Sequence, residues 1–299
     1  MTPRRYQITH VTTYTYDDDV TDSFGLTFCR PRDGAGQTVV EHELWTDPGH
    51  ADLGSHLDAQ GNHATYFHVT EPHRELRVGA RSVVDCLVEQ PAPERDLVVW
   101  EDARPAARSD LPEAALVAEV AVASPLVDVG PAVRAYAADS LLPGRPLVDA
   151  VLDLVHRVHA DFDYDPGSTT VSTRVPEVLR LRSGVCQDFA HLTIAALRSH
   201  GLAARYVSGY LATDPPPGQP RLVGADATHA WVQCWIPAHG WLSVDPTNDR
   251  ETGDRHIAVA WGRDYADVPP VKGVIFTEAT ESTMSVEVDV APATGELPT

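Results

Sequence analysis

Positive charge is scarce in this chain. Its 299 residues include 43 aspartates and glutamates but only 23 lysines and arginines, Lys272 is the single lysine, and the formal net charge is −20. Proteins that bind nucleic acid gain much of their affinity by placing Lys and Arg on phosphates, which releases counterions. An acidic excess of this size argues against that mode of binding, so we expect no nucleic acid among the partners of the protein.

Long hydrophobic runs are also missing. Residues 1–16 include two arginines but no apolar stretch of the length that a secretory signal needs. No later run approaches the roughly 20 apolar residues of a membrane-spanning helix. We therefore expect a soluble, cytoplasmic protein without a membrane partner. Hydrophobic residues make up 43% of the chain, which is ample for a large core.

Cysteine is rare as well, and no two cysteines have CxxC spacing; the four are Cys29, Cys86, Cys186 and Cys234. This scatter predicts neither a disulfide framework nor a zinc site, and no other cluster has the spacing of metal ligands. We expect no metal and no cofactor. Cys29, Cys86 and Cys234 lie in strand-like segments, where a buried, inert thiol is the favoured interpretation.

The N-terminal third of the chain has the pattern of a β domain. Residues 4 to about 90 are rich in aromatic and β-branched side chains between turn signals, which predicts an antiparallel sheet or sandwich. Residues 89–110 are rich in proline and charge and indicate a linker. We therefore divide the chain into an N-terminal β domain, residues 1–100, and a second domain, residues 101–299, which includes the C-terminal strands.

The remainder mixes helices and strands. Apolar residues three and four apart predict helices over residues 131–142 and 146–162. Residues 185–200 carry apolar side chains on nearly every face and stop at Gly201, which predicts a buried, central helix. Strands are predicted at residues 204–212, 228–236, 240–246 and 284–290. The predicted fold class is α+β.

Cys186 falls in the first turn of the predicted central helix. Unpaired backbone N–H groups and the positive end of the helix dipole favour a thiolate there. The same N–H groups could hold the oxyanion of a tetrahedral intermediate. The alternative is a small buried hydrophobe, because free cysteine is among the most frequently buried residues.

Strand alternation selects a partner for Cys186. In the segment THAWVQCWI, period two places His229 and Trp231 on one face and Cys234 on the other. The short turn that follows brings Asp245 beside His229 on the adjacent strand. A cysteine, a histidine and a carboxylate form the nucleophile, base and orienting group of acyl transfer. Taken singly, His229 could be a half-buried histidine, and Asp245 a turn residue before proline.

Three motifs in this order, GVCQDFAH, THAW and GWLSVDPTN, resemble the transglutaminase-like superfamily of papain-like cysteine enzymes, in particular a bacterial branch of predicted cysteine proteases. YQITHVTTYTY near the start resembles the N-terminal β domain of that branch, and residues 262–273 resemble its C-terminal signature. The resemblance implies a papain-like, transglutaminase-like catalytic core after an N-terminal antiparallel β domain. It also implies that Cys186 is the nucleophile, His229 the base and then the acid, and Asp245 the orienting carboxylate.

Four further residues are candidates for shaping the site or lining the substrate cleft, namely Gln187, Asp188, Tyr164 and Trp231. Gln187 or Tyr164 is a candidate second oxyanion donor beside the Cys186 N–H. The tryptophan that animal-type transglutaminases use has no counterpart, since the nearest upstream tryptophan, Trp100, lies in the linker. His191 is excluded as the base because five helical residues rotate it roughly 140° away from Cys186.

The predicted activity is thiol-dependent acyl transfer on amide or peptide bonds through a Cys186 thioester, as in a cysteine peptidase or amidase acting on a peptide or protein. One alternative is a protein-glutamine transglutaminase that uses an amine as the acceptor. Another is a binding or scaffolding protein of the same fold without turnover. Hydrolysis is favoured because nothing in the sequence specifies a site for an amine acceptor.

Overall fold

The computed structural model describes residues 3–34, 36–87, 93–104, 114–213 and 228–293. The helices are α1 (Ala114–Glu119), α2 (Pro131–Ala138), α3 (Leu147–Asp161), α4 (Val175–Leu181) and α5 (Cys186–Ser199), with 3₁₀ turns η1 (Pro93–Leu97), η2 (Trp100–Ala103) and η3 (Tyr265–Asp267). The strands before α5 are β1 (Arg4–Thr27), β2 (Gln37–Asp47), β3 (Asp52–Leu57), β4 (His63–Val69), β5 (His73–Cys86), β6 (Asp163–Tyr164) and β7 (Ser183–Gly184). The strands after α5 are β8 (Ala204–Leu211), β9 (Thr228–Ile236), β10 (Gly240–Asp245), β11 (Arg250–Glu251), β12 (His256–Gly262), β13 (Val271–Thr277) and β14 (Ser282–Pro292).

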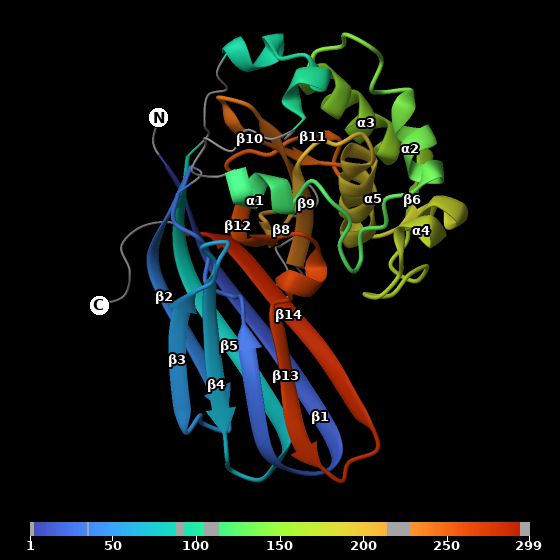
Figure 1. The fold of residues 1–299 in the computed structure, drawn as a ribbon. Helices are drawn as coiled ribbons and strands as arrows, with labels where there is room; N and C mark the ends of the chain where they lie inside the picture. The colour runs from blue at the N-terminus through green and yellow to red at the C-terminus, as the bar shows by residue number, and fades with distance from the viewer. Residues whose placement is uncertain (1–2, 35, 88–92, 105–113, 214–227, 294–299) are drawn as a thin grey trace, which may run out of the picture.

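The N-terminal residues form a curled antiparallel sheet with the strand order β2-β5-β1-β4-β3. Its central strand, β1, is 24 residues long and changes partners along its length. The first part pairs with β5 and β14, and the last part pairs with β4 and β13. Figure 1 shows these strands as one elongated layer below the helical part of the molecule. The prediction of an N-terminal antiparallel β region is confirmed.

The C-terminal strands return to this N-terminal sheet. β14 pairs with β1 from Tyr6 opposite Pro292 to Tyr16 opposite Ser282, and β13 pairs with β1 from Val20 to Thr27. The sheet therefore joins segments from the two ends of the chain (Figure 1). The alternation in residues 284–290 predicted a strand, which is present, but alternation does not identify the partner of a strand. The division at residue 100 stays a prediction.

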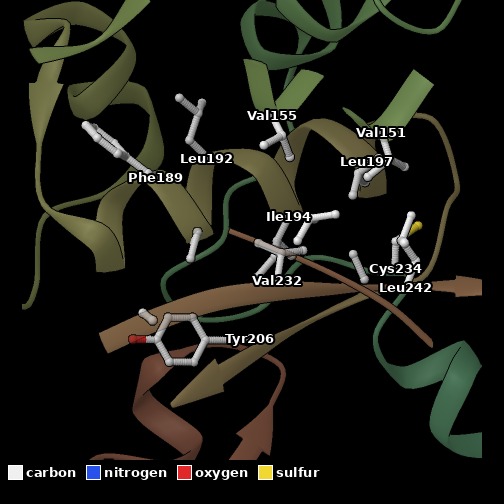
Figure 2. Close-up of a cluster of buried hydrophobic side chains, with 14 of the residues drawn as sticks. Val151, Val155, Phe189, Leu192, Ile194, Leu197, Tyr206, Val232, Cys234 and Leu242 are labelled. Atoms are coloured by element: carbon white, nitrogen blue, oxygen red, sulfur yellow. The ribbon is translucent and has the colours of Figure 1, made fainter. Parts of the chain in front are cut away.

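A second sheet carries the helices. Its strand order is β11-β10-β9-β8-β12, and α5 packs on one face of it. In Figure 2, Ile194 and Leu197 of α5 lie against Val232 and Cys234 of β9. Every residue of α5 after Cys186 is buried, because α2, α3 and α4 pack around its other sides. The predicted α+β core and its buried central helix are both confirmed.

The two sheets meet at β12, where two side-chain amides pair with backbone groups. Gln37 Nε2 donates to the Ala258 carbonyl at 2.8 Å, and Gln37 Oε1 accepts from the Ala258 N–H at 2.8 Å. Asn62 does the same with Trp261, at 2.8 and 2.9 Å. β12 is the last strand of its sheet, so these amides satisfy backbone groups that would otherwise be unpaired.

Gln37→Met is expected to lower the free energy of unfolding by about 2 kcal/mol or more. Methionine keeps the length of the side chain but leaves the buried N–H and C=O of Ala258 without partners. Urea unfolding measures the change, with Gln7→Met as a control because Gln7 is only partly buried. Equal midpoints for the two variants would contradict this role of Gln37.

None of the helices in the described ranges is both long enough and apolar enough to cross a membrane. The cytoplasmic location stays a prediction.

Candidate active site

Cys186 is the first residue of α5, and the start of that helix is held by Asp188. The preceding residue, Val185, is extended and donates its N–H to Asp188 Oδ2 at 2.9 Å. The Thr169 hydroxyl donates to the same oxygen at 2.6 Å. A Cβ at Gly184 would lie 2.8 Å from the Asp188 side chain, so this closely packed turn requires glycine. Asp188 thus positions the nucleophile through the backbone around it.

The buried position of Asp188 also affects its charge. Burial raises the pKa of its carboxyl, while the hydrogen bonds from Thr169 and Val185 act in the opposite direction and do not cancel the rise. A carboxylate this close to Cys186 would oppose formation of the thiolate. The hydrogen bonds from Val185 and Thr169 offset part of the negative charge of Asp188, and its raised pKa makes the neutral carboxyl more accessible. Both effects reduce the repulsion between Asp188 and a Cys186 thiolate.

His229, in β9, connects Cys186 with Asp245 at the end of β10. Its Nε2 donates to Asp245 Oδ2 at 2.7 Å, which leaves Nδ1 for the thiol. Burial acts to lower the pKa of His229, but hydrogen bonds with Asp245 and Cys186 prevail and raise it to about 10. The imidazole therefore carries its proton at neutral pH. This is the charge state that pairs with a thiolate.

Five donors converge on the fully buried carboxylate of Asp245. The backbone N–H groups of Thr247 and Asn248 reach Oδ1 at 2.9 and 3.2 Å. The Asn248 amide, His229 Nε2 and His256 Nε2 reach Oδ2 at 2.7, 2.7 and 3.0 Å. Burial acts to raise the pKa of Asp245, yet these bonds lower it far below its ordinary value. Asp245 is therefore a permanent carboxylate that orients His229.

His256 and Asn248 are members of the site that sequence reasoning missed. His256 ends the polar, mostly charged segment 248–256, yet its side chain is only 4% exposed. His256 begins β12, which is separated from β10 by two strands of the sheet, yet its ring reaches Asp245 at 3.0 Å. Asn248 lies within the motif GWLSVDPTN, three residues after the aspartate, and this was the one available signal.

His229, Asp245 and His256 also have potential metal-ligand atoms within 4.8 Å of one another. Both imidazoles, however, direct an Nε2 proton at the same carboxylate oxygen. A metal would need the lone pairs of these nitrogens instead, and both carboxylate oxygens are already saturated with donors. The donor set fits a hydrogen-bonded triad better than a metal centre, and the absence of a metal stays a prediction.

The other residues singled out from the sequence surround this triad. The Gln187 amide donates to the Val171 carbonyl at 2.9 Å. Tyr164 pairs with Gly184 in the short sheet of β6 and β7 and is 57% exposed. Burial, with the nearby charge of Cys186, raises the pKa of its hydroxyl. Trp231 is buried, with its ring 6.1 Å from that of His229, so it packs behind the imidazole.

The other histidine and the other cysteines considered from the sequence lie outside the catalytic site. His191 is 1% exposed and accepts the Tyr265 N–H at its Nε2, and burial lowers its pKa to about 4. It is a neutral core histidine on another face of α5. Cys29, Cys86 and Cys234 are buried free thiols, and burial raises the pKa of each to about 12. Cys186 is the only partly exposed cysteine, and all four lie in the described ranges.

Comparisons with known proteins identify the same two parts of the chain. Residues 6–85 match the bacterial transglutaminase-like N-terminal region, and residues 134–246 match the transglutaminase-like superfamily. An uncharacterized protein of Mycobacterium tuberculosis is 50% identical over 98% of this chain and 94% of its own length. A protein-glutamine gamma-glutamyltransferase of Pseudomonas aeruginosa is 34% identical over 35% of this chain, which is 18% of that protein.

One solved structure has the same fold throughout. It is that of a proposed cysteine protease from Cytophaga hutchinsonii, which aligns with 100% of this chain and 94% of its own at a TM-score of 0.71 and 19% identity. Members of families of this kind are generally enzymes, either cysteine proteases or transglutaminases. With its N-terminal curled sheet, its central helix and both family matches, the chain belongs to the transglutaminase-like superfamily.

Proposed function

We propose that the protein is a cysteine peptidase or amidase that transfers an acyl group from an amide to water through a Cys186 thioester. The observation that carries this proposal is the position of His229, which is hydrogen-bonded to buried Asp245 at 2.7 Å and lies near enough to Cys186 for that residue to raise the pKa of the imidazole. A pKa of about 10 for His229 favours a thiolate–imidazolium pair at neutral pH.

The first half of the reaction forms the thioester. The Cys186 thiolate attacks the amide carbonyl carbon, and the C–S bond forms as the carbonyl oxygen becomes an oxyanion. His229 then gives its proton to the leaving nitrogen, so that the C–N bond breaks and a neutral amine departs. Asp245 stabilises the charged imidazole and keeps its ring oriented throughout.

The second half restores the enzyme. Neutral His229 removes a proton from water, and the resulting hydroxide attacks the thioester carbonyl. The tetrahedral intermediate collapses, the C–S bond breaks, and a carboxylic acid leaves while the thiolate–imidazolium pair is regenerated. An amine in place of water would give a new amide by the same steps.

The oxyanion requires at least one fixed donor. We assign the Cys186 N–H, because the first N–H groups of a helix have no acceptor within it. Of the two side-chain candidates, Tyr164 is favoured. The Gln187 amide already donates to Val171, whereas Tyr164 lies on the strand that pairs with Gly184, two residues before the nucleophile.

Tyr164→Phe is expected to lower kcat by about 10²-fold with little change in KM, because an oxyanion donor acts mainly in the transition state. Steady-state kinetics on a hydrolysed peptide measure the effect. Tyr136→Phe is the control, since the Tyr136 hydroxyl bonds to Asp161 rather than facing Cys186. An unchanged kcat in Tyr164→Phe would rule out this donor.

A protein-glutamine transglutaminase is the second candidate function. The observation in its favour is the relative from Pseudomonas aeruginosa, whose similarity to this chain extends over 123 residues. The two activities share the thioester and differ only in the acceptor. A scaffolding role without turnover is less well supported, because Cys186, His229 and Asp245 are all present and connected.

A mass-spectrometric screen of glutamine-containing peptides tests the proposal. The peptides are incubated with the protein, with and without a primary amine, and compared with Cys186→Ala. Peptide cleavage or deamidation that needs no amine supports hydrolysis, and amine incorporation as the main product would support the transglutaminase instead. No mass change with any peptide or amine would favour the scaffold.

A further inference from the structure

A cavity of about 410 Å³ lies on the face of the second sheet that is turned away from α5. Alternation places Arg205, Gln233 and Ser243 on this face, since their neighbours Ala204, Val232 and Val244 belong to the core under α5. Gln37 and Leu87 of the N-terminal part close the other side. The cavity therefore lies between the two sheets of the molecule.

Arg205 is the central feature of this cavity. It is only 6% exposed, and its guanidinium carbon lies 3.8 Å from the ring centre of Trp241 and 3.7 Å from that of Trp261. Its Nε donates to Gln233 Oε1 at 2.8 Å, and the Gln233 amide donates to Ser243 Oγ at 2.7 Å. Two indole rings and a short polar chain thus hold the guanidinium in one orientation.

Arg205 has no acidic partner in the described ranges. Its side-chain hydrogen bond is made by Nε, and the two Nη nitrogens have no protein acceptor there. Burial, with Arg32 nearby, lowers the pKa of Arg205 to about 8, and no carboxylate acts in the opposite direction. An unpaired buried charge is costly to a fold. It is especially notable in a chain with 20 more acidic than basic residues.

We propose that this cavity binds a small organic carboxylate, with the Nη groups of Arg205 as its charged anchor and the indoles of Trp241 and Trp261 beside it. A guanidinium presents two parallel N–H donors that match the two oxygens of a carboxylate. The volume is that of a small-ligand pocket. This inference is independent of the reaction proposed for Cys186.

The charges in the cavity favour a monoanion over a phosphate. The other arginine in its wall, Arg95, is already paired with Glu251 at 2.8 Å. Arg205 is therefore the single uncompensated arginine among the described residues of the wall. Leu87 and the rings of Trp231, Trp241 and Trp261 supply apolar surface, which suits an organic body attached to the carboxylate.

The carboxylate site lies behind the catalytic triad. His256 and Trp231 line the cavity, whereas Cys186 and His229 are not among its described lining residues. His256 reaches through to Asp245 at 3.0 Å, and the Trp231 ring is 5.4 Å from that of His256. The site is thus distinct from the place where the thiol meets an amide.

Titration calorimetry of the full chain with benzoate tests the proposal, with benzamide as the neutral molecule of the same shape. Wild type is expected to bind one benzoate saturably and benzamide at least tenfold more weakly. Arg205→Met should lose at least tenfold in benzoate affinity, because two charge-assisted hydrogen bonds disappear. Glu251→Gln should bind benzoate more tightly, since it removes a carboxylate from the cavity wall.

Two further variants separate the effect of charge from that of the paired donors and control for the loss of an arginine. Arg205→Lys retains the charge without the paired donors and should bind benzoate more weakly than wild type. Arg174→Met is the control for loss of an arginine elsewhere, since Arg174 pairs with Asp128. Equal binding of benzoate and benzamide to wild type, or unchanged benzoate affinity in folded Arg205→Met, would overturn the proposal. Binding of inorganic phosphate but not of benzoate would overturn the assignment of a carboxylate.

Discussion

Asp245→Asn is expected to lower kcat about 10⁴-fold and to move the alkaline limit of activity to lower pH. The carboxylate holds the imidazole in the productive tautomer, and an amide in its place can present a donor where an acceptor is needed. The carboxylate is also the strongest of the groups that raise the pKa of His229. Without it, burial prevails and His229 loses its proton at lower pH.

The sign of this pH dependence follows from the charge of the imidazole. In the folded protein the pKa of His229 is raised from 6.5 to about 10. The stabilisation from its ion pairs is fully present below pH 6.5, declines as the pH rises, and is lost above about pH 10. The imidazolium of His229 in the wild type should therefore persist through neutral pH and lose its proton near pH 10.

The rate of Cys186 alkylation by iodoacetamide measures this effect without knowledge of the substrate. At pH 7, wild type should react much faster than Asp245→Asn, because the variant lacks the imidazolium that stabilises the thiolate. Asp249→Asn is the matched control, since Asp249 bonds to His156 at 2.8 Å on the surface. Equal rates in wild type and Asp245→Asn would contradict the role assigned to Asp245.

Cys186→Ala is expected to reduce turnover by about 10⁶-fold, since no other group can form the thioester. The fold should persist, because Cys186 is partly exposed at the start of α5 and alanine is a good helix former. Product formation from a hydrolysed peptide, followed by mass spectrometry, measures the loss.

Cys234→Ala is the control for this second experiment, because Cys234 lies in the core under α5 (Figure 2). It should lower stability modestly and leave kcat nearly unchanged. If Cys186→Ala retained the activity of wild type, the thioester mechanism would be wrong. A chelator added to wild type should change nothing.

Local patterns were sufficient to predict the elements that carry the nucleophile and the base. The continuous apolar surface of residues 185–200 predicted a buried helix, and alternation in β9 separated His229 from Cys234. Helical periodicity likewise excluded His191 as the base, because it places His191 on a different face of the helix from the Cys186 thiol. These inferences succeed because side-chain direction within one helix or strand depends on backbone geometry alone.

Local patterns failed where a residue acts through a distant element. Nothing in the acidic segment around His256 indicated that its ring would reach Asp245, and β13 and β14 gave no sign that they pair with β1. The sequence likewise did not indicate that the charge of Arg205 would be unpaired. Arginine in a strand is ordinary until neighbouring strands show that tryptophans, and no carboxylate, surround it in the described ranges.

The sequence by itself determined the order of the elements, the face on which each side chain lies, and three motifs that carry a nucleophile, a base and a carboxylate. Only the tertiary structure decided which groups complete the site. The His256 bond to Asp245, the pairing of Gln37 and Asn62 with β12, and the stacking of Arg205 between Trp241 and Trp261 all join separate segments of the fold. Such contacts depend on long-range packing, and no local periodicity encodes them.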